Sequence, residues 1–152
     1  MFFWFIGTAV VTVWFVFRDP RFDYRLLIIG AVLPGIVDSI TVSVVLLLVL
    51  MLVTPRGTAL RRTLLALPIG MLLHLVFTGA WMNARVFWWP FLGWSVDDAS
   101  HAVIERGWWN VPLELIGLGL CGWVFSRAEL ADPARRREFW RTGRLALPEA
   151  TS

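Results

Sequence analysis

Three ionisable side chains stand within otherwise apolar stretches of this chain, namely Asp38, His74 and Glu114. An aspartate at the centre of a membrane helix costs about 2.5 to 3.5 kcal/mol on insertion scales, so each such group needs a reason to be there. Carboxylates and imidazoles are ligands for divalent metals, and a metal-bound water can hydrolyse a substrate. We therefore take all three as candidate catalytic residues, and Asp38 and His74 as candidate metal ligands.

The spacing of these residues predicts that they share one depth in a bilayer. Each lies 12 or 13 residues from an arginine that would mark the cytoplasmic boundary: Arg25 for Asp38, Arg62 for His74 and Arg127 for Glu114. At about 1.5 Å per residue, each is about 18 to 20 Å from that boundary. We therefore expect a polar pocket in the outer half of the bilayer, opening outward.

Each candidate also has a purely structural interpretation. A single histidine in a span can be a hydrogen-bonded packing residue, as His74 would then be. Asp38 can cap the helix that follows it, and Glu114 can lie in the first turn of its own helix, where the dipole favours an acid. Asp97 and His101 have the spacing of two ligands on one helix face, but acids in an outer loop are usually solvated.

The composition places this chain in a membrane. Of its 152 residues 58% are hydrophobic, ten are tryptophan, and all 14 basic residues are arginine. Such a composition does not fit a soluble domain of this size. Base-stacking motifs and a soluble basic face are missing, so we exclude nucleic-acid binding. The single cysteine, Cys121, lies in an apolar run and is expected to be a packing residue.

Apolar runs and arginines together predict an all-α, polytopic bundle of about five spans. The expected spans are residues 2–17, a hairpin over 26–53 that bends at 34–39, residues 63–80 and residues 111–126. Twelve of the 14 arginines then lie on one side, which predicts an N-terminus outside and a C-terminus inside a bacterial plasma membrane. Six of the ten tryptophans fall in 81–110, a predicted outer aromatic belt.

The expected organisation is an integral membrane domain over 1–127 and a cytoplasmic basic tail over 128–152. Asp132 and Pro133 have the pattern of a helix cap and first helical residue, and arginines then alternate with Phe139 and Trp140. This pattern predicts a short interfacial helix on the bilayer. Its partners would be anionic lipid headgroups, or it would serve only to fix the topology.

Most of the chain between the first span and the tail resembles the bacterial membrane-bound metal-dependent hydrolase family, particularly actinobacterial members of about this length. The likeness lies in DYRLLIIGAVLPGIVD (23–38), RRTLLALPIGMLLHLVFTGAW (61–81), VFWWPFLGW (86–94) and RGWWNVPLELIG (106–117). The family pattern has an LPD-x-x-D element, a histidine early in the next helix and an HL-x-x-D element. The resemblance implies His and carboxylate ligands for a divalent metal.

This chain keeps only part of that pattern. Asp38 matches the second acid and His74 the later histidine, but Gly35 and Thr78 stand where the family has acids. A catalytic zinc site usually has three protein ligands. The third would have to come from Glu114 or from the loop residues Asp97 and His101.

Two functions follow from these observations. The first is a non-catalytic structural or interaction protein whose site is partly lost and holds no metal. Its partner would be another membrane protein or a second copy of the chain, bound through the aromatic belt and the glycines of 117–122. The alternative is a hydrolase whose divalent metal, zinc before others, acts on a lipid-linked or cell-envelope substrate at the outer leaflet. A transporter is disfavoured, because the short spans show no inverted repeat.

Overall fold

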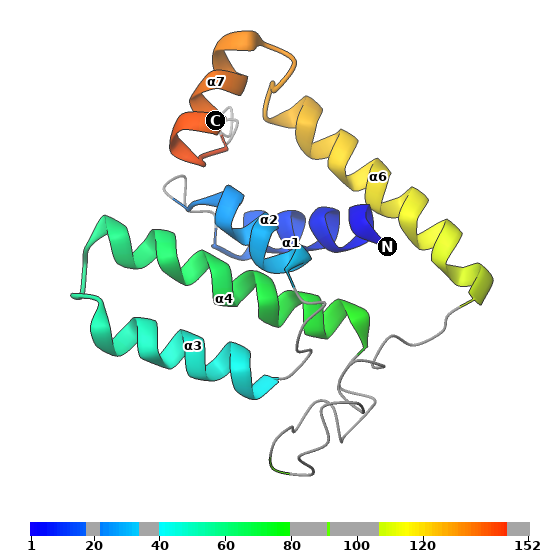
Figure 1. The fold of residues 1–152 in the computed structure, drawn as a ribbon. Helices are drawn as coiled ribbons and strands as arrows, with labels where there is room; N and C mark the ends of the chain where they lie inside the picture. The colour runs from blue at the N-terminus through cyan, green and yellow to red at the C-terminus, as the bar shows by residue number, and fades with distance from the viewer. Residues whose placement is uncertain (18–21, 34–39, 80–90, 92–106, 146–152) are drawn as a thin grey trace.

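The computed structural model describes residues 1–17, 22–33, 40–79, 91 and 107–145. Within these ranges the chain is entirely helical and contains no strand, so the predicted all-α class is confirmed (Figure 1). The elements are α1 (Phe2–Phe17), α2 (Tyr24–Val32), α3 (Ile40–Val53), α4 (Ala59–Thr78), the 3₁₀ turn η3 (Gly107–Trp109), α6 (Asn110–Arg127) and α7 (Pro133–Thr142).

Helix ends follow the capping residues of the sequence. As predicted, Asp132 caps α7, since its side chain accepts from the Ala134 amide at 2.9 Å. The predicted start of the fourth span at residue 63 is wrong: α4 begins at Ala59, because the Thr58 hydroxyl accepts from the Arg61 amide at 3.3 Å. Arg61 is therefore part of the helix. At its other end, α4 stops where Gly79 adopts the left-handed conformation.

The predicted hairpin of residues 26–53 corresponds to two helices, α2 and α3. Its expected bend at 34–39 lies outside the described residues. Both helices pack against α4, and α1 packs against α6 (Figure 1).

Glycines set how closely these helices approach each other. A Cβ added to Gly30 would lie 2.2 Å from the Leu67 carbonyl oxygen, and one added to Gly70 would lie 2.3 Å from the Leu27 oxygen. The backbones of α2 and α4 are therefore in direct contact at these two residues. Small residues permit such contact between helices, and a larger side chain would separate them.

A second glycine pair joins α1 and α6. A Cβ on Gly117 would lie 2.2 Å from the Trp4 nitrogen, and one on Gly7 would lie 2.7 Å from the Gly117 oxygen. Two other glycines of α6, Gly119 and Gly122, have nothing within 4 Å of an added Cβ. Only one side of α6 is therefore packed tightly against the described helices.

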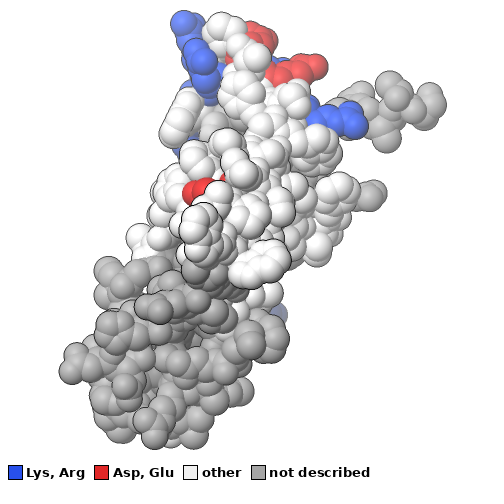
Figure 2. Space-filling model, turned by 90° about the vertical axis from the view of Figure 1, so that its right-hand side faces the viewer, with Lys and Arg blue, Asp and Glu red and all other residues white. Residues whose placement is uncertain are grey.

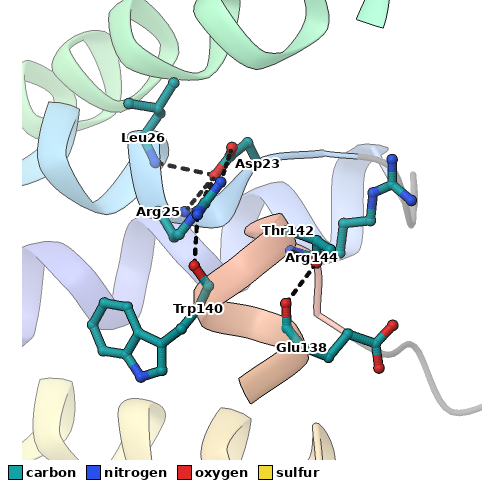
Figure 3. Close-up of polar contacts among 7 residues, drawn as sticks. All are labelled: Asp23, Arg25, Leu26, Glu138, Trp140, Thr142 and Arg144. Carbon is teal, nitrogen blue, oxygen red and sulfur yellow. Dashed lines mark hydrogen bonds and ion pairs between the residues drawn. The ribbon is translucent and has the colours of Figure 1, made fainter. Parts of the chain in front are cut away.

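The tail helix α7 is hydrogen-bonded to the first residues of α2. The Tyr24 amide donates to the Gly143 carbonyl at 2.8 Å, and the Arg25 guanidinium donates to the Trp140 carbonyl at 2.7 Å (Figure 3). Asp23 caps α2 through the Arg25 amide and pairs with the Arg25 guanidinium at 3.0 Å. Leu145 is buried in the same core as residues of α1 and α2. The described part of the tail is thus packed on the helical body.

Large apolar side chains cover the outside of the helices. In α3 the buried residue is Ser43, at 1% exposure, whereas Leu52 and Val53 are 84% and 75% exposed. In α6 the buried residues are Gly117 and Val124, and the exposed residues include Leu115 and Ile116. This arrangement is the reverse of that in a water-soluble bundle, in which the leucines and valines of a helix face its core.

One described helix, α4, is long and apolar enough to cross a bilayer by itself. Its 20 residues correspond to about 30 Å, the thickness of a hydrocarbon core. α1 and α3 are apolar but shorter, at 16 and 14 residues. The five predicted crossings therefore stay a prediction.

Candidate functional site

His74 lies in the core of the bundle and joins three helices. Its ring is 6% exposed, and its Nδ1 is 2.7 Å from the carbonyl oxygen of Ala31 in α2. The ring of Phe5 in α1 lies against it, with 4.2 Å between the ring centroids. The imidazole of α4 therefore contacts both α1 and α2.

Thr78 lies one turn after His74 in α4. Its hydroxyl donates to the backbone oxygen of His74, and the residue is 8% exposed. Its oxygen is thus bonded within α4.

Glu114 caps α1 from a different helix. Its Oε1 accepts from the amides of Phe2 and Phe3 at 2.9 and 3.1 Å, and its Oε2 accepts from the Trp4 amide at 3.4 Å. The first amides of a helix have no partner within the helix, and a carboxylate there also interacts favourably with the helix dipole. Glu114 therefore stabilises the first turn of α1.

This geometry differs from the structural interpretation that the sequence suggested for Glu114. Since α6 begins at Asn110, Glu114 lies in the second turn of its own helix, and the first turn contains no acid. The dipole with which it interacts is that of α1. A signal for this contact was present in the sequence, because Met1 at the cap position of α1 offers no side-chain oxygen and the amides of its first turn need an acceptor from elsewhere.

His74 and Glu114 are both placed around the beginning of α1. Glu114 binds the amides of residues 2–4, and His74 lies against the ring of Phe5. The Trp4 indole also donates to the Phe77 carbonyl, at 3.4 Å, which links α1 to the same end of α4. The two side chains are thus at a similar level of the bundle. The third predicted site residue, Asp38, lies outside the described residues, as do Asp97 and His101.

We tested whether the described side chains could hold the metal that the family resemblance implies. Among them, no group of three or more His, Cys, Asp or Glu residues is close enough to bind a metal ion. Both oxygens of Glu114 accept backbone hydrogen bonds, and His74 Nδ1 is bonded to Ala31. The described residues therefore do not form a metal site.

Sequence reasoning missed an apolar cavity of about 150 Å³ beside the middle of α1 and the second half of α6. It is partly open and lies between α1, α2, α6 and α7, with Val10, Phe125 and Phe139 among its lining residues. Cys121 also lines it, and its thiol approaches the Phe3 carbonyl at 3.8 Å. The sequence contained a partial signal, since Phe139 is an apolar residue among the arginines of α7.

Comparisons with known protein families, with characterised proteins and with solved structures find no match to this chain.

Proposed function

We propose that this chain is an integral membrane protein with a structural or interaction role, and that its polar side chains join helices instead of catalysing a reaction. The observation that carries the membrane assignment is the reversed polarity of α3, which buries Ser43 and exposes leucines and valines. In water, exposure of a continuous apolar helix face is strongly unfavourable. In lipid, exposure of the same face carries no such free-energy cost.

The interior of the bundle supports the same proposal. Most of the buried residues of α4 are small or polar, and two are large and apolar: the set is Ala66, Pro68, Gly70, Met71, His74, Leu75 and Thr78. Membrane helices associate through small residues and hydrogen bonds, because apolar side chains gain nothing by leaving lipid. The contacts of Gly70 and His74 are of these two kinds.

The distribution of charge agrees with a bilayer boundary. Figure 2 shows most of the charged side chains of the described residues gathered toward the upper end, with an acidic side chain lower down among uncharged ones. The described arginines lie at the starts of α2 and α4, at the end of α6 and along α7. We infer that these positions face the cytoplasm, which gives an N-terminus outside and a C-terminus inside.

The non-catalytic role is supported by the bonds of the two described site candidates. Glu114 completes the first turn of α1, and His74 links α4 to α2. The interaction role is supported by the open side of α6. Gly119 and Gly122 lie there near exposed leucines, and such small residues allow close approach of a helix from a second copy of this chain or from another membrane protein.

The alternative is the metal-dependent hydrolase that the family resemblance implies. Its specific support is the common level of His74 and Glu114 around residues 2–5 of α1. Its ligands would have to include Asp38, with Asp97 or His101, none of which is among the described residues.

The membrane assignment predicts that the protein stays in the pellet when bacterial membranes are washed with sodium carbonate at high pH. Single cysteines in a Cys121→Ala background then report the orientation. A cysteine at Arg137 should react with an impermeant maleimide only after the membrane is opened, and a cysteine at Trp108 should react in intact cells. Release by carbonate, or labelling of both positions in intact cells, would contradict the proposal.

The non-catalytic role predicts that detergent-purified protein contains less than about 0.1 metal ion per chain, and that chelator leaves its thermal unfolding midpoint unchanged. His74→Ala should lower this midpoint, because it removes the Ala31 hydrogen bond and the Phe5 contact, and should not alter the metal content. One zinc per chain that disappears in His74→Ala, measured by plasma mass spectrometry, would establish the hydrolase alternative.

A further inference from the structure

The apolar cavity beside α7 has the size and walls of a site for part of a hydrocarbon chain. Its volume is about 150 Å³, and its lining residues include Val10 of α1, Ile28 of α2, Phe125 of α6 and Phe139 of α7. Apolar cavities of about this volume stay dry and bind benzene-sized groups. None of the described residues that line it is charged. An alkyl segment is thus a better occupant of this cavity than water.

Arginines of α7 are close in sequence to Phe139, a residue of the cavity wall. Arg136 precedes Phe139 by three residues, so the two are neighbours on the surface of α7. Arg135 pairs with Glu129 and Glu138, each at 3.8 Å. Arg136 and Arg137 are exposed, and neither has an ion pair with another residue of the described ranges. They are available to an anion from outside the chain.

Other features place this site at a lipid headgroup level. Trp140, next to Phe139, is 68% exposed, and amphipathic indoles concentrate at the membrane interface. Residues 127–145 contain six arginines against three acids, so the segment favours anionic over zwitterionic lipid. The end of α7 is fixed by two bonds to its backbone, one from the Tyr24 amide to the Gly143 carbonyl and one from the Arg25 guanidinium to the Trp140 carbonyl, the second of which Figure 3 shows. Phe139, next to Trp140, lines the cavity.

We propose that one anionic phospholipid binds between α1, α6 and α7, with a segment of its acyl chain in the cavity and its phosphate on Arg136, the neighbour of Phe139. The exposed Arg137, on another side of α7, adds to the positive charge of this helix. The proposal rests on the membrane assignment made above. The positive charge of α7 and the apolar cavity wall to which its Phe139 belongs select a molecule that has both an anionic group and an alkyl chain. A lipid bound in this way would connect the tail helix to the body of the bundle.

The test is native mass spectrometry of the full chain, purified in a neutral detergent and mixed with palmitoyl-oleoyl phosphatidylglycerol or the matching phosphatidylcholine. We expect one phosphatidylglycerol to be retained about tenfold more strongly than phosphatidylcholine. The Arg136→Gln/Arg137→Gln variant should lose about tenfold in this affinity. The control variant Arg56→Gln/Arg62→Gln, which removes the same charge from the α3–α4 end, should bind as the parent does.

The cavity is tested by filling it. Val124 lines the cavity, and Val124→Phe should reduce phosphatidylglycerol retention about tenfold, whereas Val45→Phe on the exposed side of α3 should not. Should Val124→Phe fail to fold, Leu130→Phe at the same cavity serves instead. Equal retention of both lipids, or equal loss in the two arginine variants, would overturn the proposal. Protein that resists carbonate but retains no phosphatidylglycerol overturns only this inference, while release by carbonate overturns the membrane assignment itself.

Discussion

Gly117→Ala should destabilise the protein by about 3 kcal/mol, at the upper end of the usual cost of overpacking. The added methyl would lie 2.2 Å from the Trp4 nitrogen and 2.4 Å from the Phe3 carbonyl carbon. These are backbone atoms, which cannot turn aside as a flexible side chain can. The helices α1 and α6 would have to separate, and the thermal unfolding midpoint in detergent should fall by about 6 to 12 °C.

The matched control is Gly119→Ala, two residues further along α6. Nothing lies within 4 Å of its added Cβ, so the substitution only replaces glycine with a better helix former. It should raise the free energy of unfolding by about 0.5 to 1 kcal/mol. Glycine to alanine would then destabilise the protein at residue 117 and stabilise it at residue 119 of the same helix. A similar loss in both variants would mean that the cost of Gly117→Ala does not come from the close contact with α1.

Glu114→Ala should lower the free energy of unfolding by about 3 kcal/mol, because three amides of α1 lose their acceptor together. On the proposed membrane assignment, these amides have no water to replace it. Glu114→Gln keeps one acceptor oxygen and should lose about half as much. Thermal unfolding in detergent, together with amide hydrogen exchange at residues 2–4, measures the effect.

Glu138→Ala is the control for this loss of charge. Glu138 is 58% exposed and its partner Arg135 is 3.8 Å away, so its removal should change stability by less than about 0.5 kcal/mol. If Glu114→Ala were as mild as Glu138→Ala, or if exchange at residues 2–4 were unchanged, Glu114 would not be the cap of α1.

Helix ends could be predicted from the sequence where the residues that determine them are adjacent in the chain. The ends of α1 were predictable because an apolar run stops at Phe17 before Arg18, and the start of α7 because Asp132 and Pro133 form a local cap. The start of α4 was misplaced because the arginines were taken as a boundary. The hydroxyl of Thr58 determines it instead.

The partners of the site candidates were beyond prediction for a different reason. His74 bonds to Ala31, 43 residues away, and Glu114 bonds to Phe2, 112 residues away. Depth along a span could be estimated from residue counts, and it placed His74 and Glu114 at a similar level. Which face of a helix meets which neighbour depends on the glycine contacts between the helices, and a single sequence does not specify those pairings.

The cap that α6 provides for α1 also bears on how the protein is made. α1 leaves the ribosome about one hundred residues ahead of Glu114, and until then its leading amides lack the acceptor seen in the finished fold. Contacts between such distant segments form late. α1 is therefore translated well before it can mature, and, on the proposed membrane assignment, a chain truncated before α6 should present α1 as a substrate for membrane quality-control proteases.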